Sequence, residues 1–271
     1  LDDHICHRGD GLFESLCYRD RRIFALDKHL ARLMEGARTL KIQPPCSWEE
    51  LRQHILDVAY ASEQDQGNLR VFLSRGPGGF GITPEECSTA GLYIVALKYA
   101  PPKESFYAQG LTAFTSEIPP KQAYLARIKN TNYLPNVFMA AEAREKGYDV
   151  AVSFDAQGIM GEAAIANIAL VSNEGCFVYP VLANILAGTT LLTAVSIARA
   201  CMPVEERGIT HEDIWQAQEV FLLTSSSLCV AITHFDDKPL GKAEYRGRPG
   251  HFALWLKDQL YTELHKDGVQ F

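Results

Sequence analysis

The sequence lacks long apolar runs, paired cysteine motifs and an excess of basic charge. No apolar stretch approaches the roughly 18 residues that a membrane-spanning helix needs, so we expect no membrane partner. The seven cysteines are scattered and form no Cys-x-x-Cys pair, which argues against a disulfide framework or a metal site and favours a reducing cytoplasm. The formal net charge of -7 leaves no basic face for a nucleic acid, which is therefore not an expected partner.

Length and composition predict a globular enzyme with two domains. Of the 271 residues, 47% are hydrophobic and 22% are charged, which is ordinary for such an enzyme. A Pro-Pro pair within residues 98–104 interrupts the pattern, and we place the domain boundary there. We predict an α/β (α+β) fold with a smaller N-terminal α/β domain at 1–101 and a larger domain at 102–271. The first residue is Leu1 rather than methionine, so we expect further residues to precede it in the full protein.

Alternating or short apolar runs predict strands, and apolar residues at helical spacing predict helices. The predicted strands cover residues 12–18, 22–26, 69–74, 91–97, 111–115, 149–155, 166–172, 176–179, 219–224 and 230–235. The predicted helices cover residues 27–40, 47–62, 133–146, 188–201 and 251–265. Asp27 is the expected N-cap of the first helix, and Ser47 opens the second with a capping box.

Three short motifs follow one another in the second half of the chain. Lys129 and Asn132 form Lys-x-x-Asn, Glu162 and Asn167 form Glu-x4-Asn, and Gly188 begins Gly-Thr-Thr. A pyridoxal phosphate site needs an amine for the aldehyde, an acid near the pyridine nitrogen, and N–H and O–H donors for the phosphate. Taken singly, the motifs also fit a solvated lysine, a turn acid and a strand-edge amide; the series is what indicates the site.

The order and spacing of these motifs resemble the class IV (fold type IV) pyridoxal-phosphate-dependent enzymes. That family includes branched-chain and D-amino-acid aminotransferases and aminodeoxychorismate lyase. Residues 9–14 and the His-Leu-x-Arg-Leu motif at 29–33 are similar to its N-terminal signature. The resemblance implies a pseudo-barrel in the larger domain and a homodimer with pyridoxal 5'-phosphate at the domain interface. It also implies a loop from the partner subunit near the substrate, for which residues 76–81 are the candidate.

The resemblance assigns roles to individual residues. Lys129 is the expected catalytic residue, which forms a Schiff base with the cofactor and moves a proton, and Glu162 would keep the pyridine nitrogen protonated. The other expected cofactor-binding residues are Arg32, Asn167, Gly188, Thr189, Thr190, Thr224 and Ser225. The expected substrate-binding residues are Phe13, Arg75, Phe80, Tyr133 and Ser226. The alternative for Arg32 is an ion pair with Glu35 on its own helix, and the alternative for residues 75–81 is a simple connection between strands.

The sequence departs from the family pattern in three places. Leu191 follows the Gly-Thr-Thr motif where the family carries an arginine, and what replaces that arginine is open. Ala169 stands where an aromatic residue often follows Glu-x4-Asn. Tyr133 lies four residues after Lys129 rather than five, which weakens a branched-chain assignment.

We expect the chain to transfer an amino group between a small amino acid and a 2-oxo acid. The glycine-rich loop, which is similar to that of the lyases, supports an alternative. In that alternative the chain is a 4-amino-4-deoxychorismate lyase that forms 4-aminobenzoate and pyruvate. A second alternative is a non-catalytic binding protein that keeps the fold, with or without the cofactor. The substrate side chain, its stereochemistry and the pathway stay open.

Overall fold

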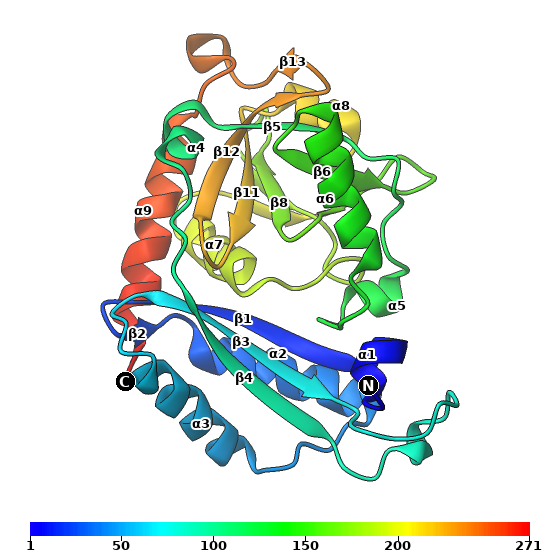
Figure 1. Cartoon of the computed structure of the whole chain (residues 1–271). Helices are drawn as coiled ribbons and strands as arrows, with labels where there is room; N and C mark the ends of the chain where they lie inside the picture. Colours follow the sequence, from blue (N-terminus) through cyan, green and yellow to red (C-terminus); the bar gives the residue numbers. More distant parts are fainter. The chain divides into compact units, whose positions relative to one another are not determined.

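A computed structural model describes all 271 residues, which form two compact units of mixed α/β structure (Figure 1). The first unit contains Leu1–Ala100, Ile128–Tyr133 and Leu264–Phe271, and the second contains Pro101–Arg127 and Leu134–Glu263. The mixed architecture confirms the predicted fold class. No helix combines the length and the apolar character needed to cross a membrane.

The predicted boundary at residue 101 was wrong for two segments that belong to the first unit, 128–133 and 264–271. The reason is backbone hydrogen bonding to strands of that unit. Phe13 N–H donates to the carbonyl of Lys129 at 3.0 Å, so the first segment lies along an edge of β1 (Gly11–Arg19). Strand β14 (Val269–Gln270) pairs with β2 (Arg22–Ile23) and holds the second.

A five-stranded antiparallel sheet organises the first unit. Its order is β14-β2-β1-β3-β4, with β3 at Gly67–Ser74 and β4 at Gly91–Lys98. The other elements are α1 (His4–Arg8), α2 (Leu26–Leu40), α3 (Trp48–Ala61) and the 3-10 helix η1 (Pro84–Glu86). Helices α2 and α3 cover one face of the sheet, where alternate residues of β1 and β3 form the apolar core (Figure 1). Residues between them, such as Phe13 and Arg70, therefore lie on the opposite face.

The start of α2 differs from the prediction. The helix begins at Leu26 rather than after an Asp27 cap, and its N-cap residue, Ala25, has a left-handed backbone with φ of 52°. As a result, the predicted strand at 22–26 shrinks to the two residues of β2. The Ser47 capping box of α3 is confirmed, since its hydroxyl accepts from Glu50 N–H and the Glu50 carboxylate accepts from Ser47 N–H.

The second unit contains a nine-stranded sheet that curls on itself. Its order is β10-β9-β8-β11-β12-β5-β6-β7, with β13 beside β12. Ala163 N–H in β7 donates to the Ala166 carbonyl just before β8 at 3.1 Å, which brings the end of the sheet back to its middle as a pseudo-barrel requires. Its interior is apolar, with Leu170, Val178 and Val220 almost fully buried.

The elements of the second unit follow the predicted order, with several short ones added. The strands are β5 (Leu111–Thr115), β6 (Val150–Phe154), β7 (Met160–Ala163), β8 (Asn167–Val171), β9 (Phe177–Tyr179), β10 (Val204–Glu206), β11 (Glu219–Thr224), β12 (Leu228–Phe235) and β13 (Lys238–Pro239). The helices are α4 (Glu104–Gln109), α5 (Ala123–Ala126), α6 (Leu134–Lys146), α7 (Thr189–Arg199), α8 (His211–Gln216), the 3-10 helix η2 (Ala243–Tyr245) and α9 (His251–Lys266), whose last residues belong to the first unit. Strand β7, which carries Glu162, was not predicted.

Candidate active site

Lys129 lies on the face of the first sheet that the helices leave uncovered. Its Nζ is 4.5 Å from the centroid of the Phe13 ring, a cation–π distance. The Tyr133 ring meets the same phenyl ring edge-on, with centroids 5.0 Å apart. Arg70 of β3 approaches the Phe13 ring as well, with its guanidinium carbon 6.0 Å from the centroid. The structure thus brings the predicted catalytic amine together with two predicted substrate-binding residues.

Arg32 forms a two-pronged ion pair with Glu14 of β1. Its Nε donates to Oε1 at 2.8 Å and its Nη2 donates to Oε2 at 2.7 Å. His29, one turn earlier on α2, has its Nδ1 2.6 Å from the same Oε2. The alternative pairing of Arg32 with Glu35 is wrong, because Glu35 pairs with Arg38 at 3.6 Å instead. The predicted phosphate-binding arginine is therefore part of a buried network rather than a surface pair.

The charges in this network follow from burial and pairing. Burial opposes ionisation of Glu14, but the neighbouring His29 and Arg32 outweigh it and lower the pKa of Glu14 to about 2. Burial lowers the pKa of His29, and the charges of Arg32 and Lys129 act in the same direction against the raising effect of Glu14. At neutral pH the network therefore holds a carboxylate and a guanidinium, and His29 Nδ1–H donates to the carboxylate, which can only accept.

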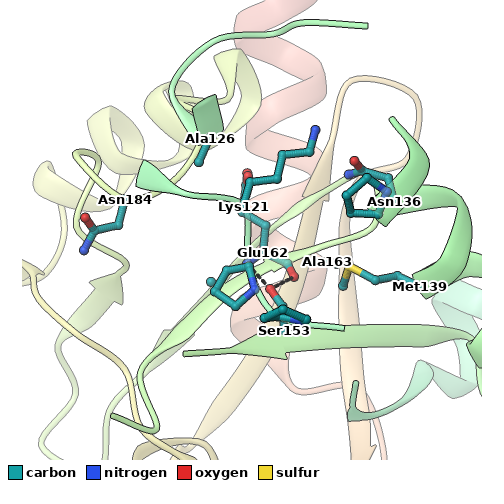
Figure 2. Close-up of a pocket in the computed structure, with 12 residues that line it drawn as sticks. Lys121, Ala126, Asn136, Met139, Ser153, Glu162, Ala163 and Asn184 are labelled. Carbon is teal, nitrogen blue, oxygen red and sulfur yellow. Dashed lines mark hydrogen bonds between the residues drawn. The ribbon is translucent and has the colours of Figure 1, made fainter. Parts of the chain in front are cut away.

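Glu162 lines a small pocket in the second unit (Figure 2). The Ser153 hydroxyl fixes its backbone, donating to the Glu162 carbonyl at 3.0 Å and accepting from its N–H at 3.2 Å. Asn167 fixes its side chain, with Nδ2 2.9 Å from Oε1. The same Nδ2 also donates to the Leu186 carbonyl at 2.9 Å. Asn167, predicted to bind the cofactor, is 5% exposed and here holds the Glu162 carboxylate in one orientation.

Two further polar groups line this pocket. Burial lowers the pKa of the Lys121 ammonium, whereas the charge of Glu162 raises it. Asn136 Oδ1 is buried and has no hydrogen-bond partner. The pocket volume of about 30 Å³ has room for a water molecule.

The Gly-Thr-Thr motif begins helix α7. Gly188 is the N-cap residue, and Thr189 and Thr190 form the first turn, where the amides have no helical partner of their own. Both threonines are buried, at 5% and 4% exposure. A Cβ atom at position 188 would lie only 2.0 Å from Asn167 Oδ1, so the glycine is what lets α7 approach Asn167. This close approach links the second and third sequence motifs directly.

We expect Gly188→Ala to lower the free energy of unfolding by about 1–3 kcal/mol, because the added methyl group must displace Asn167. Gly208→Ala is the matched control, since its Cβ would be no closer than 3.3 Å to any atom, the nearest being Cδ1 and Cγ2 of Ile159. Urea unfolding of both variants measures the difference. Equal losses of stability would show that the approach of Gly188 to Asn167 is not what requires the glycine.

The predicted hydroxyl run lies in the turn between β11 and β12. The Thr224 hydroxyl is 2.6 Å from the Ser227 hydroxyl and 3.3 Å from that of Ser226, and it accepts from Ser227 N–H at 3.0 Å. Thr224, Ser225 and Ser226 are each partly exposed, whereas Ser227 is buried. The turn therefore presents several hydroxyl donors at the end of one strand, as a phosphate site requires.

Arg75 and Phe80, the other predicted substrate residues, have different surroundings. Arg75 pairs with Asp10 at 2.9 Å and donates to the carbonyls of Leu40 and Lys41 at 2.8 and 3.0 Å. These bonds tie the start of the glycine-rich loop to α2. The Phe80 side chain is 72% exposed. Their roles toward a substrate stay predictions.

Three residues of these surroundings received no role from the sequence. Glu14 and His29 fall within the N-terminal signature, and that signature was the available signal for them. Lys121 follows the Pro119-Pro120 pair and has no local signal, because only the fold places it beside Glu162.

The family comparison agrees with this set of residues. A family model described as "Amino-transferase class IV" matches residues 11–235, which include Lys129, Glu162 and the Gly-Thr-Thr motif. The chain belongs to the class IV aminotransferase family, whose members are pyridoxal-phosphate-dependent enzymes.

The similar proteins include both aminotransferases and an aminodeoxychorismate lyase. The chain is 30% identical over 271 residues to "D-amino-acid transaminase, chloroplastic" of Arabidopsis thaliana, covering 97% of this chain and 71% of that protein. The structure of 4-amino-4-deoxychorismate lyase from Pseudomonas aeruginosa is similar with a TM-score of 0.86 and 27% identity, covering 97% and 94% of the two chains. The branched-chain aminotransferase of Escherichia coli shares the fold, with a TM-score of 0.90, 22% identity and coverage of 97% and 88%.

Proposed function

We propose that the chain transfers an amino group between a small amino acid and a 2-oxo acid, with Lys129 as the amine that holds pyridoxal phosphate. The observation that carries the proposal is the Glu162 carboxylate, fixed by Asn167 at 2.9 Å in a small pocket. A carboxylate held in one orientation suits a ring nitrogen that must keep its proton. The 30% identity to a D-amino-acid transaminase supports transfer as the leading reaction.

The residues present fit the cofactor. Lys129 supplies the amine, Glu162 the acid, and Arg32, Thr189, Thr190, Thr224 and Ser225 supply donors suited to a phosphate dianion. When bound, pyridoxal phosphate supplies an electron sink for the negative charge that forms at the substrate α carbon.

Lys129 would also move the proton that leaves the substrate α carbon. Its Nζ lies over the face of the Phe13 ring, and the Tyr133 ring meets that phenyl ring edge-on, so the two rings limit where the amine can lie. A neutral amine can accept the proton and later return it at a different atom, which is what amino transfer requires. Phe13 and Tyr133 would limit the space for the substrate side chain.

A second candidate reaction is the lyase reaction that forms 4-aminobenzoate and pyruvate. It is favoured by the Ser-Arg-Gly-x-Gly-Gly loop at 74–79 and by the likeness to the Pseudomonas aeruginosa lyase. Both reactions need the same amine and acid, so the residues that distinguish them lie around the substrate. The expected homodimer and the cytoplasmic location stay predictions. Phe80 and Ile82, 72% and 83% exposed, are what a partner subunit would cover on the loop at 76–86.

The visible absorption spectrum during substrate addition tests the proposal. We expect small amino acids of one configuration, either D or L, to convert the bound cofactor to its pyridoxamine form, with release of the matching 2-oxo acid. Release of 4-aminobenzoate from aminodeoxychorismate, without accumulation of the pyridoxamine form, would establish the lyase instead. Bound cofactor without turnover of either substrate class would support the non-catalytic alternative. A protein that takes up no pyridoxal phosphate would overturn both reactions and leave only the fold.

A further inference from the structure

A carboxylate lies in the apolar layer between the first sheet and its helices. Glu14 is 1% exposed and alternates along β1 with Leu12 and Leu16, two members of the apolar core. Moving a carboxylate out of water is costly, and an apolar residue of similar size at such a place is often as stabilising as an ion pair. The stability of the fold therefore gives little reason for an acid at this position. A role for Glu14 must come from its hydrogen-bond partners.

The contacts of Glu14 fix a guanidinium plane. Two parallel hydrogen bonds, Nε to Oε1 at 2.8 Å and Nη2 to Oε2 at 2.7 Å, leave Arg32 little freedom to rotate. His29 Nδ1, 2.6 Å from Oε2, holds the carboxylate itself in place. The three side chains therefore form a series of contacts in which His29 holds Glu14 and Glu14 holds Arg32.

The exposed fractions of the three side chains show which of them faces outward. The side chains of His29 and Glu14 are 3% and 2% exposed, whereas that of Arg32 is 15% exposed. Only the arginine of the three reaches the edge of the cluster, and its buried partners stand behind it. This arrangement is typical of a hydrogen-bond donor, here the Arg32 guanidinium, that buried partners hold in place. It differs from an ion pair that the core encloses on all sides.

The negative charge of Glu14 does not by itself explain why an acid stands beside a proposed phosphate-binding arginine. Lys129 and Arg32 both attract an anion, whereas the Glu14 carboxylate, which is ionised because its pKa is lowered to about 2, repels it. On charge alone, removal of Glu14 would strengthen phosphate binding. If Glu14 orients the guanidinium, its removal would weaken phosphate binding. The two explanations predict opposite signs for one measurement.

We propose that Glu14 and His29 are positioning residues that hold the Arg32 guanidinium for the cofactor phosphate. This inference rests on the proposed function, in which Arg32 binds that phosphate. Glu14 and His29 touch neither substrate nor cofactor in this scheme and act only through Arg32. They add to the cofactor site two residues whose effect depends on the phosphate group.

The test compares two ligands, pyridoxal 5'-phosphate and pyridoxal, which differ only in the phosphate. Dissociation constants come from absorption titrations of the apoenzyme. We expect Glu14→Gln, which keeps the side-chain size but breaks the fork, to weaken binding of pyridoxal 5'-phosphate about tenfold. Pyridoxal binding is expected to stay unchanged. A purely structural role for Glu14 would weaken both ligands alike, and tighter binding of the phosphate ester would mean that charge dominates.

Two His29 variants provide an independent test of the same preference for the phosphate ester over pyridoxal, in case Glu14→Gln does not fold. His29→Asn places an amide N–H near the position of Nδ1 and is expected to keep the preference for the phosphate ester. His29→Leu removes the donor to Oε2 and is expected to lower that preference about threefold. Equal preference in both variants would contradict the inference.

Arg32→Ala separates this inference from the proposed function. If it abolishes the preference for the phosphate ester while Glu14→Gln leaves the preference intact, positioning is wrong and the role of Arg32 stands. If Arg32→Ala also leaves the preference intact, the assignment of the phosphate to Arg32 is itself wrong.

Discussion

Lys129→Ala is expected to abolish covalent attachment of the cofactor and to lower turnover at least about 10³-fold. The variant removes both the amine that binds the aldehyde and the group that moves the substrate proton. The neighbouring cation at the same ring, Arg70, cannot take over, because a guanidinium keeps its proton and does not form an imine. Noncovalent binding through the phosphate and Glu162 would persist, so the variant should still bind pyridoxal phosphate.

The matched control for Lys129 is Lys121→Ala. Lys121 is the other lysine beside a candidate cofactor residue, and burial lowers the pKa of its ammonium, which makes it a plausible amine on chemical grounds. Borohydride reduction, digestion and mass spectrometry locate the attached cofactor. We expect the label on Lys129 in the wild-type protein and its retention in Lys121→Ala. A label on Lys121 would overturn the assignment of the catalytic amine.

Local patterns were enough to predict most elements and the order of the motifs. Apolar periodicity predicted α6 within a few residues of its observed bounds, and the Gly-Thr-Thr motif did begin a helix, α7. These features depend on neighbours in the sequence. Strand β7, with Gly161 and Glu162 among its four residues, offers no alternating apolar pattern and was missed for that reason.

Long-range pairing decided what the sequence could not predict. Residues 128–133 belong to the first unit because their backbone pairs with β1, more than 100 residues earlier, and no local signal records such a partner. The partner of Arg32 shows the same limit. Helical spacing offered Glu35, but the packing of α2 on β1 brought Glu14 closer and buried it. Asn167 belongs to the Glu-x4-Asn motif in the sequence, yet only the fold shows that its amide holds Glu162.

Glu162→Gln is expected to leave cofactor binding nearly unchanged and to lower turnover about 10²-fold or more. The glutamine carbonyl can still accept from Asn167 Nδ2, so the geometry at Oε1 is kept and only the negative charge is lost. Without that charge, the pyridine nitrogen loses the partner that favours its protonated form, and the ring withdraws electrons less strongly. The variant therefore separates the charge of Glu162 from its position.

Glu142→Gln is the matched control, because Glu142 is a carboxylate of the same unit that pairs with Ser116 and Lys146. It should keep nearly full turnover. The measurements are kcat, the dissociation constant of the cofactor, and the pH dependence of the spectrum of the bound cofactor. A loss of affinity with unchanged kcat would mean that Glu162 only binds the ring. An unchanged spectrum with reduced kcat would place its action on the substrate instead, so only the combined change in kcat and spectrum supports a role at the pyridine nitrogen.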